Sequence, residues 1–121
     1  MNEKAEKLLS EIVGLSLPLA DVHRGTIDDW APERPPATIA YGAVGTKLVD
    51  IFDELDPNTR RSIFALVEDG MQSDDEATGT AVATGLIEAL AGRASRTGRW
   101  ERVRAELGSL SRSHAEAWLQ G

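Results

Sequence analysis

The chain contains no cysteine and only two histidines, His23 and His114. The lack of cysteine excludes disulfides, thiolate metal ligands and a cysteine nucleophile, and it fits a protein of the reducing cytoplasm, where we expect this one to act. A metal site needs several ligands grouped at short spacing, and two distant histidines do not provide that group. We therefore expect neither a metal nor another cofactor.

Long hydrophobic runs are also missing. The only apolar run near the start, residues 12–20, is short and follows Glu3, Glu6 and Glu11. A membrane-spanning helix needs about 20 mainly apolar residues, and a signal peptide begins with a positively charged segment. The sequence therefore predicts no membrane span and no signal peptide.

Positive charge is in the minority. The chain has 13 Lys and Arg against 20 Asp and Glu, which gives a net charge of −7. A chain of this sign repels phosphate backbones, so nucleic acid is not an expected partner. A basic protein would be attracted to it over long distances.

The pattern of a β-sheet is absent as well, because no segment combines alternating polarity, β-branched clusters and hairpin turns. Apolar residues instead recur at helical spacing over residues 3–16, 36–55, 57–71, 75–91 and from residue 98 onward. A chain of 121 residues, 41% of them hydrophobic, suffices for one core. We predict a single all-α domain over residues 1–121, a compact bundle of five or six helices.

The clearest signals lie in residues 56–91. Asp56 and Pro57 suit the N-cap and the first position of one helix, and the acids at residues 74–76 favour the start of the next. This pair resembles one antiparallel HEAT-type unit. Ala81, Gly85 and Gly92 share a strip of small residues where another backbone could lie close. Glycines at 42 and 45 inside a helix likewise indicate close packing.

Two stretches interrupt the helical pattern. Gly25, Pro32, Pro35 and Pro36 break it in residues 17–35, which we interpret as an ordered linker with one short helix at 27–31. Residues 1–35 would then be an N-terminal helix plus a Pro-rich linker, and residues 36–121 the helical core. Gly108 is a second candidate break, after which Ser109 or Ser111 could cap a new helix.

Two motifs invite a catalytic or nucleotide-binding interpretation. Residues 42–47 (GAVGTK) resemble part of a phosphate-binding loop, but the full spacing and the preceding strand are missing, so small residues in a packed helix are the better reading. His114 with Ser111 or Ser113 as nucleophile would need an orienting carboxylate that no spacing supplies, and a concave polar pocket. We favour a structural histidine and expect no enzymatic activity.

Carboxylates are the most conspicuous candidates for partner binding. A helix start needs one cap, whereas residues 74–76 are three consecutive acids, and an up-and-down bundle would bring further acids to the same end. This surplus is unfavourable within a fold and would attract a basic partner. The predicted partner-binding residues are Asp28, Asp29, Glu33, Asp69, Asp74, Asp75 and Glu76.

Three segments resemble a family of small helical bacterial proteins that are found near polymorphic toxin genes and are regarded as immunity proteins. They are residues 82–90 (VATGLIEAL), 64–68 (FALVE) and 107–119 (LGSLSRSHAEAWL), and the resemblance covers residues 36–119. Ser109 departs from the pattern, in which proline follows Gly108. The resemblance implies that the protein neutralises a cognate toxin domain by occlusion; a HEAT-like adaptor without a toxin partner is the alternative.

Overall fold

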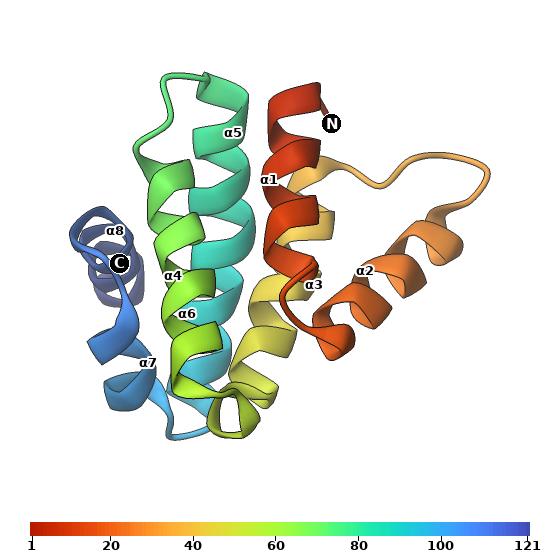
Figure 1. Ribbon diagram of the computed structural model, residues 1–121. Coiled ribbons are helices and arrows are strands. Elements are labelled where there is room, and N and C mark those ends of the chain that lie inside the picture. Colours follow the sequence, from red (N-terminus) through yellow and green to blue (C-terminus); the bar gives the residue numbers. More distant parts are fainter.

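The computed structural model describes all residues from 1 to 121 and contains no strand (Figure 1). It has seven helices when the consecutive segments α5, η2 and α6 are counted as one continuous helix. The all-α prediction is confirmed, and the predicted number of five or six helices is wrong. No helix combines the length and the apolar composition needed to cross a lipid bilayer. In chain order the elements are α1 (Glu3–Val13), α2 (Leu17–Trp30), α3 (Ala37–Asp50), the 3₁₀ turn η1 (Phe52–Glu54), α4 (Pro57–Met71), α5 (Glu76–Thr80), the π-helical segment η2 (Ala81–Ile87), α6 (Glu88–Arg96), α7 (Trp100–Glu106) and α8 (Ser109–Gln120).

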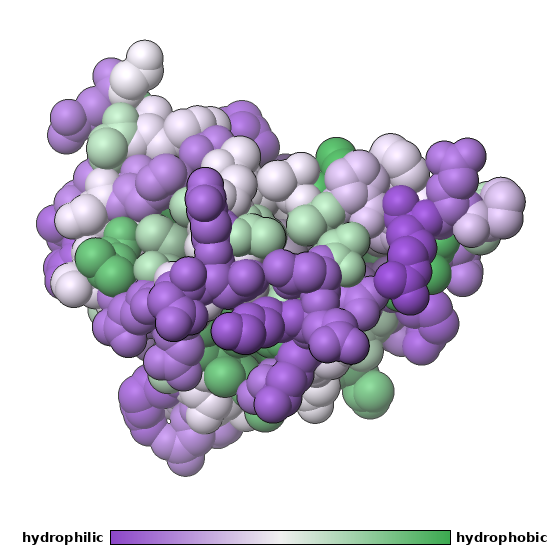
Figure 2. All heavy atoms as spheres, turned by 90° about the horizontal axis from the view of Figure 1, so that it is seen from above, coloured by the Kyte–Doolittle hydropathy of each residue, from purple (hydrophilic) through white to green (hydrophobic).

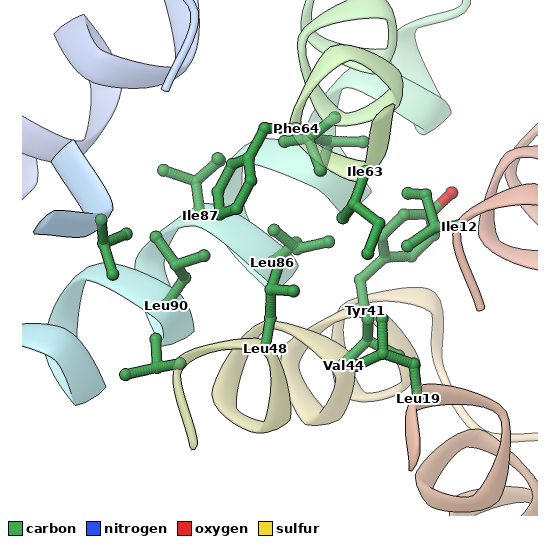
Figure 3. Packing of buried hydrophobic residues seen from close by; sticks show 14 of the residues in the cluster. Ile12, Leu19, Tyr41, Val44, Leu48, Ile63, Phe64, Leu86, Ile87 and Leu90 are labelled. Atoms are coloured by element: carbon green, nitrogen blue, oxygen red, sulfur yellow. The ribbon is translucent and has the colours of Figure 1, made fainter. Parts of the chain in front are cut away.

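The centre of the bundle is one continuous helix formed by α5, η2 and α6. It packs against α3 on one side, and α4 and α8 contact it elsewhere. Val82, Leu86 and Leu90 of this helix are fully buried. Figure 3 shows Leu86 pointing toward Leu48 of α3 and toward Ile63 of α4. The apolar arc predicted from helical spacing is therefore the middle of the core.

The glycines of α3 and η2 allow these two helices to lie unusually close together. A Cβ on Gly45 would clash with the carbonyl oxygen of Leu86, and a Cβ on Gly85 would lie 2.9 Å from Tyr41 Cβ and 3.0 Å from the Thr38 carbonyl oxygen. Close packing of the small-residue strip is confirmed, and at Gly85 the backbone that approaches is that of α3. The strip is buried within the fold and is not available to a partner.

The linker predicted for residues 17–35 is wrong, because most of it is the 14-residue helix α2. Ser16 is the N-cap and its hydroxyl accepts a hydrogen bond from Leu19 N at 3.5 Å. Pro18 lies in the first turn, where a helix needs no backbone N–H, so it belongs to a helix start and does not end the preceding helix. The helix ends just before Pro32, as the restriction on the residue preceding proline requires.

The predicted break at Gly108 is confirmed, but neither Ser109 nor Ser111 caps α8 with its own side chain. The carboxylate of Glu68, from α4, accepts hydrogen bonds from Leu110 N at 2.9 Å, Ser111 N at 3.0 Å and Ser111 Oγ at 2.7 Å. Burial alone would raise the pKa of Glu68, but the bonds from Ser111 and Leu110 outweigh it and lower that pKa. An acid from a distant helix thus supplies the N-terminal cap of α8.

One buried polar group also joins distant helices. The Tyr41 hydroxyl donates a hydrogen bond of 2.7 Å to the carbonyl oxygen of Ala5, so α3 is fastened to α1 inside the core. Burial raises the pKa of Tyr41, so the hydroxyl keeps its proton at neutral pH. Figure 3 shows this ring beside Ile12.

Candidate partner-binding surface

The predicted acidic residues fall into two groups, with the first turn of α1 placed between them. On one side Asn2 Nδ2 donates to Asp75 at 3.0 Å and Lys4 approaches Asp74 at 3.9 Å. On the other side Glu6 pairs at 3.1 Å with Arg34, in the segment that returns from α2 to α3. Residues 69–76 lie at the end of the bundle that carries the N-terminus, whereas the C-terminal half of α2, which contains Asp28 and Asp29, extends to the side of the bundle (Figure 1).

Two of the seven acids have partners within the chain, and one of these two has a structural role. Asp75 is the N-cap of α5 and accepts bonds from Thr78 N at 3.1 Å and Thr78 Oγ1 at 2.6 Å. The Thr78 hydroxyl is the main cause, with Asn2 second, of a lowered pKa for Asp75. Asp74 makes only the long contact to Lys4, and its side chain is 99% exposed, so this pair contributes little to stability.

The other five acids are exposed and form no salt bridge and no side-chain hydrogen bond: Asp28, Asp29, Glu33, Asp69 and Glu76. Seen from this end, the molecule presents mainly hydrophilic side chains with hydrophobic ones scattered among them (Figure 2). Because nothing within the chain neutralises these carboxylates, their charge is available to a partner.

Helix α2 adds apolar groups that sequence reasoning did not place at the surface. Only Leu19 of this helix is buried, and its C-terminal half leads away from the bundle (Figure 1). Ile27 remains 44% exposed and Trp30 39% exposed, next to Asp28 and Asp29. The sequence predicted only a short helix at 27–31, and the full helix α2 reveals how much of Ile27 and Trp30 stays in solvent.

A pocket of about 410 Å³ lies between α1, α2 and residues 31–35. Glu6, His23, Ile27, Glu33 and Arg34 are among its lining residues. The Nδ1 atom of His23 is buried without a hydrogen-bond partner, and burial lowers the pKa of His23 against the opposing influence of Glu6. This histidine is therefore neutral at pH 7. No sequence motif signalled the pocket, because it exists only once α2 is folded beside α1.

His114 has the neighbouring carboxylate that the sequence did not supply. Its Nε2 lies 3.0 Å from Glu88 Oε2, on α6. The nearby Ser111 hydroxyl is already donated to Glu68, however, and is buried, so it cannot act as a nucleophile in this arrangement. Ser113, the other candidate, is exposed and forms no hydrogen bond with His114. His114 thus joins α8 to α6, which is the structural interpretation.

The other chemical motifs are part of the packing. Gly42 and Gly45 lie within α3 and face η2, so residues 42–47 form no phosphate-binding loop. No three side chains among the His, Asp and Glu residues lie close enough together to hold a metal ion.

Comparisons with protein-family models, with curated proteins and with solved structures give no match to this chain. The likeness of residues 36–119 to immunity proteins therefore stays a prediction. The candidate site depends on the chain's own geometry: five unpaired carboxylates in two groups, and the exposed side chains of Ile27 and Trp30 on α2.

Proposed function

We propose that the protein is a non-enzymatic binding protein that neutralises a basic bacterial toxin domain by covering it, in the cytoplasm of the cell that produces both. The observation that carries this proposal is the set of five exposed acids without ion-pair partners in the chain, of which Asp28, Asp29 and Glu33 flank the exposed Ile27 and Trp30 in sequence. The resemblance described above supports it, and in this proposal α4 and the helix α5–α6 correspond to a HEAT-type pair.

The electrostatic argument concerns association more than affinity. Unpaired carboxylates on a chain of net charge −7 are mutually repulsive, so they add nothing to folding. A positively charged partner turns the same field into faster encounter, with rate gains of roughly 10- to 1,000-fold that fade at high salt. Aromatic and aliphatic groups at the centre of such a surface then slow dissociation.

The decisive experiment is co-purification of the protein from its native cells. A stoichiometric toxin domain among the bound proteins, whose toxicity disappears on co-expression, is the expected result. Recovery of a non-toxic protein complex instead would favour the HEAT-like adaptor, and the absence of any stable protein partner would refute the proposal.

Charge-reversal variants test the surface itself once the partner is in hand. Asp69→Lys with Glu76→Lys changes the charge while leaving the Asp75 cap intact, and we expect slower association at low salt with unchanged dissociation. The matched control is Glu54→Lys with Glu101→Lys, two exposed acids that are not members of the candidate site. Equal association rates for the two double variants would place the interface elsewhere.

A further inference from the structure

We propose that the pocket between α1, α2 and residues 31–35 binds one basic side chain, an arginine or a lysine, of a protein partner. Its volume of about 410 Å³ lies within the range of roughly 300–1,000 Å³ of small-molecule sites. The inference rests on the proposed function for the identity of the partner, and it assigns the centre of the contact to α2.

The walls of the pocket suit the aliphatic part of such a side chain. Leu9 is buried and forms part of the lining, and Ile27 and Pro32 contribute further apolar surface. Lysine and arginine characteristically bury their methylene groups along apolar surface while the charged group stays hydrogen-bonded or solvated. The pocket therefore offers contact along the whole length of the side chain.

The polar lining suits its charged end. Glu33 has no partner within the chain, and Glu6 holds a guanidinium already, that of Arg34 at 3.1 Å. Arg34 is 77% exposed, so this ion pair is weak and open to competition. Neutral His23 adds no opposing positive charge. A partner's guanidinium can pair with Glu33. It can also share the Glu6 carboxylate with Arg34, or displace Arg34 from it.

Other occupants fit less well. A second copy of this chain brings a net charge of −7 to an acidic end, so the two copies repel each other. An anionic ligand meets two carboxylates and finds Arg34 already paired. A purely apolar ligand would desolvate Glu33 without offering it a hydrogen-bond donor.

The test uses the full chain and two small probes, Nα-acetyl-arginine amide and its uncharged isostere Nα-acetyl-citrulline amide. Amide chemical shifts of residues 6, 23, 27 and 33 should move and saturate with the arginine probe, and binding should be at least tenfold weaker with citrulline. Glu33→Gln should weaken binding severalfold, while Glu54→Gln, outside the pocket, leaves it unchanged.

A second pair of variants examines the competition at Glu6. Arg34→Ala frees that carboxylate and should tighten binding of the arginine probe severalfold. Arg24→Ala is the control, because it also removes one positive charge. Arg24 lies on α2, pairs with Asp21 and does not line the pocket. An identical gain in both variants would mean that net charge alone controls binding, and the pocket assignment would be refuted.

Shifts that never saturate, equal binding of the two probes, or shifts centred on residues 74–76 would each overturn the assignment as well. The outcome is separable from that of the proposed function. Saturable binding in the pocket without any co-purifying toxin leaves the pocket assignment standing and refutes the function. A co-purifying toxin that binds equally well to a chain carrying Ile27→Ala and Glu33→Gln would support the proposed function and refute the pocket assignment.

Discussion

The cap that Glu68 provides for α8 leads to a sharp prediction about stability. Its carboxylate accepts three hydrogen bonds, two from backbone N–H groups and one from the Ser111 hydroxyl. Hydrogen bonds to charged groups contribute about 1.5–3 kcal/mol each, but the three share one carboxylate and are not additive. Glu68→Gln keeps one neutral acceptor, so we expect the free energy of unfolding at pH 7 to fall by about 2 kcal/mol.

The pH dependence of this loss follows from the lowered pKa of Glu68. A carboxyl group whose pKa is lower in the folded state stabilises the fold above its ordinary value of 4.5, and this contribution disappears as pH falls through the lowered pKa. Urea unfolding of the natural chain and of the Glu68→Gln variant should therefore differ at pH 7 and converge in acid. The control is Asp69→Asn, because Asp69 is an exposed and unpaired residue on the same helix. It should change the free energy of unfolding by less than about 0.5 kcal/mol.

Gly108 provides an independent check of the same contact. A Cβ at this position would lie 2.5 Å from Glu68 Cδ, so Gly108→Ala must push the carboxylate away from α8. Since both substitutions disrupt one contact, the double variant should lose clearly less stability than the sum of the single losses. Strict additivity, or a Glu68→Gln loss that persists unchanged in acid, would refute this account of the cap.

Three further predictions concern packing and capping, each measured by chemical denaturation. Gly45→Ala should destabilise by about 1–3 kcal/mol, because its Cβ meets the backbone of the central helix, whereas Gly25→Ala, which meets nothing within 4 Å, should stabilise by up to about 1 kcal/mol. A stabilising Gly45→Ala or a destabilising Gly25→Ala would contradict the packing. Tyr41→Phe should cost about 0.5–1.5 kcal/mol by removing the hydrogen bond to the Ala5 carbonyl oxygen, and no loss would mean that this bond does not stabilise the fold. Asp75→Ala should cost about 1 kcal/mol as a lost N-cap, and Asp74→Ala almost nothing; similar losses would show that the turn, and not the cap, matters.

The sequence alone was sufficient for features that depend on neighbours within one or two helical turns. Apolar spacing revealed the long helices, and Asp56 was recognisable as an N-cap because a cap bonds the backbone three residues ahead. The acids at residues 74–76 marked a helix start without showing which of them is the cap. Local signals failed where they have two meanings. Gly25 and the prolines at 32, 35 and 36 suggested breaks throughout residues 17–35, but α2 contains Gly25 in its interior and ends only before Pro32, so the helix was mistaken for a linker.

Only the tertiary structure decided how residues far apart in the chain meet. Glu68 caps a helix whose bonded amides lie 42 and 43 residues away, and His114 finds Glu88 at a separation of 26 residues. The pocket beside His23 and the burial of the glycine strip likewise depend on which helices pack together. Such contacts leave no local pattern, because they arise when one folded core brings separate helix faces into register. The acids of the candidate surface were therefore predictable from the sequence, and the pocket was not.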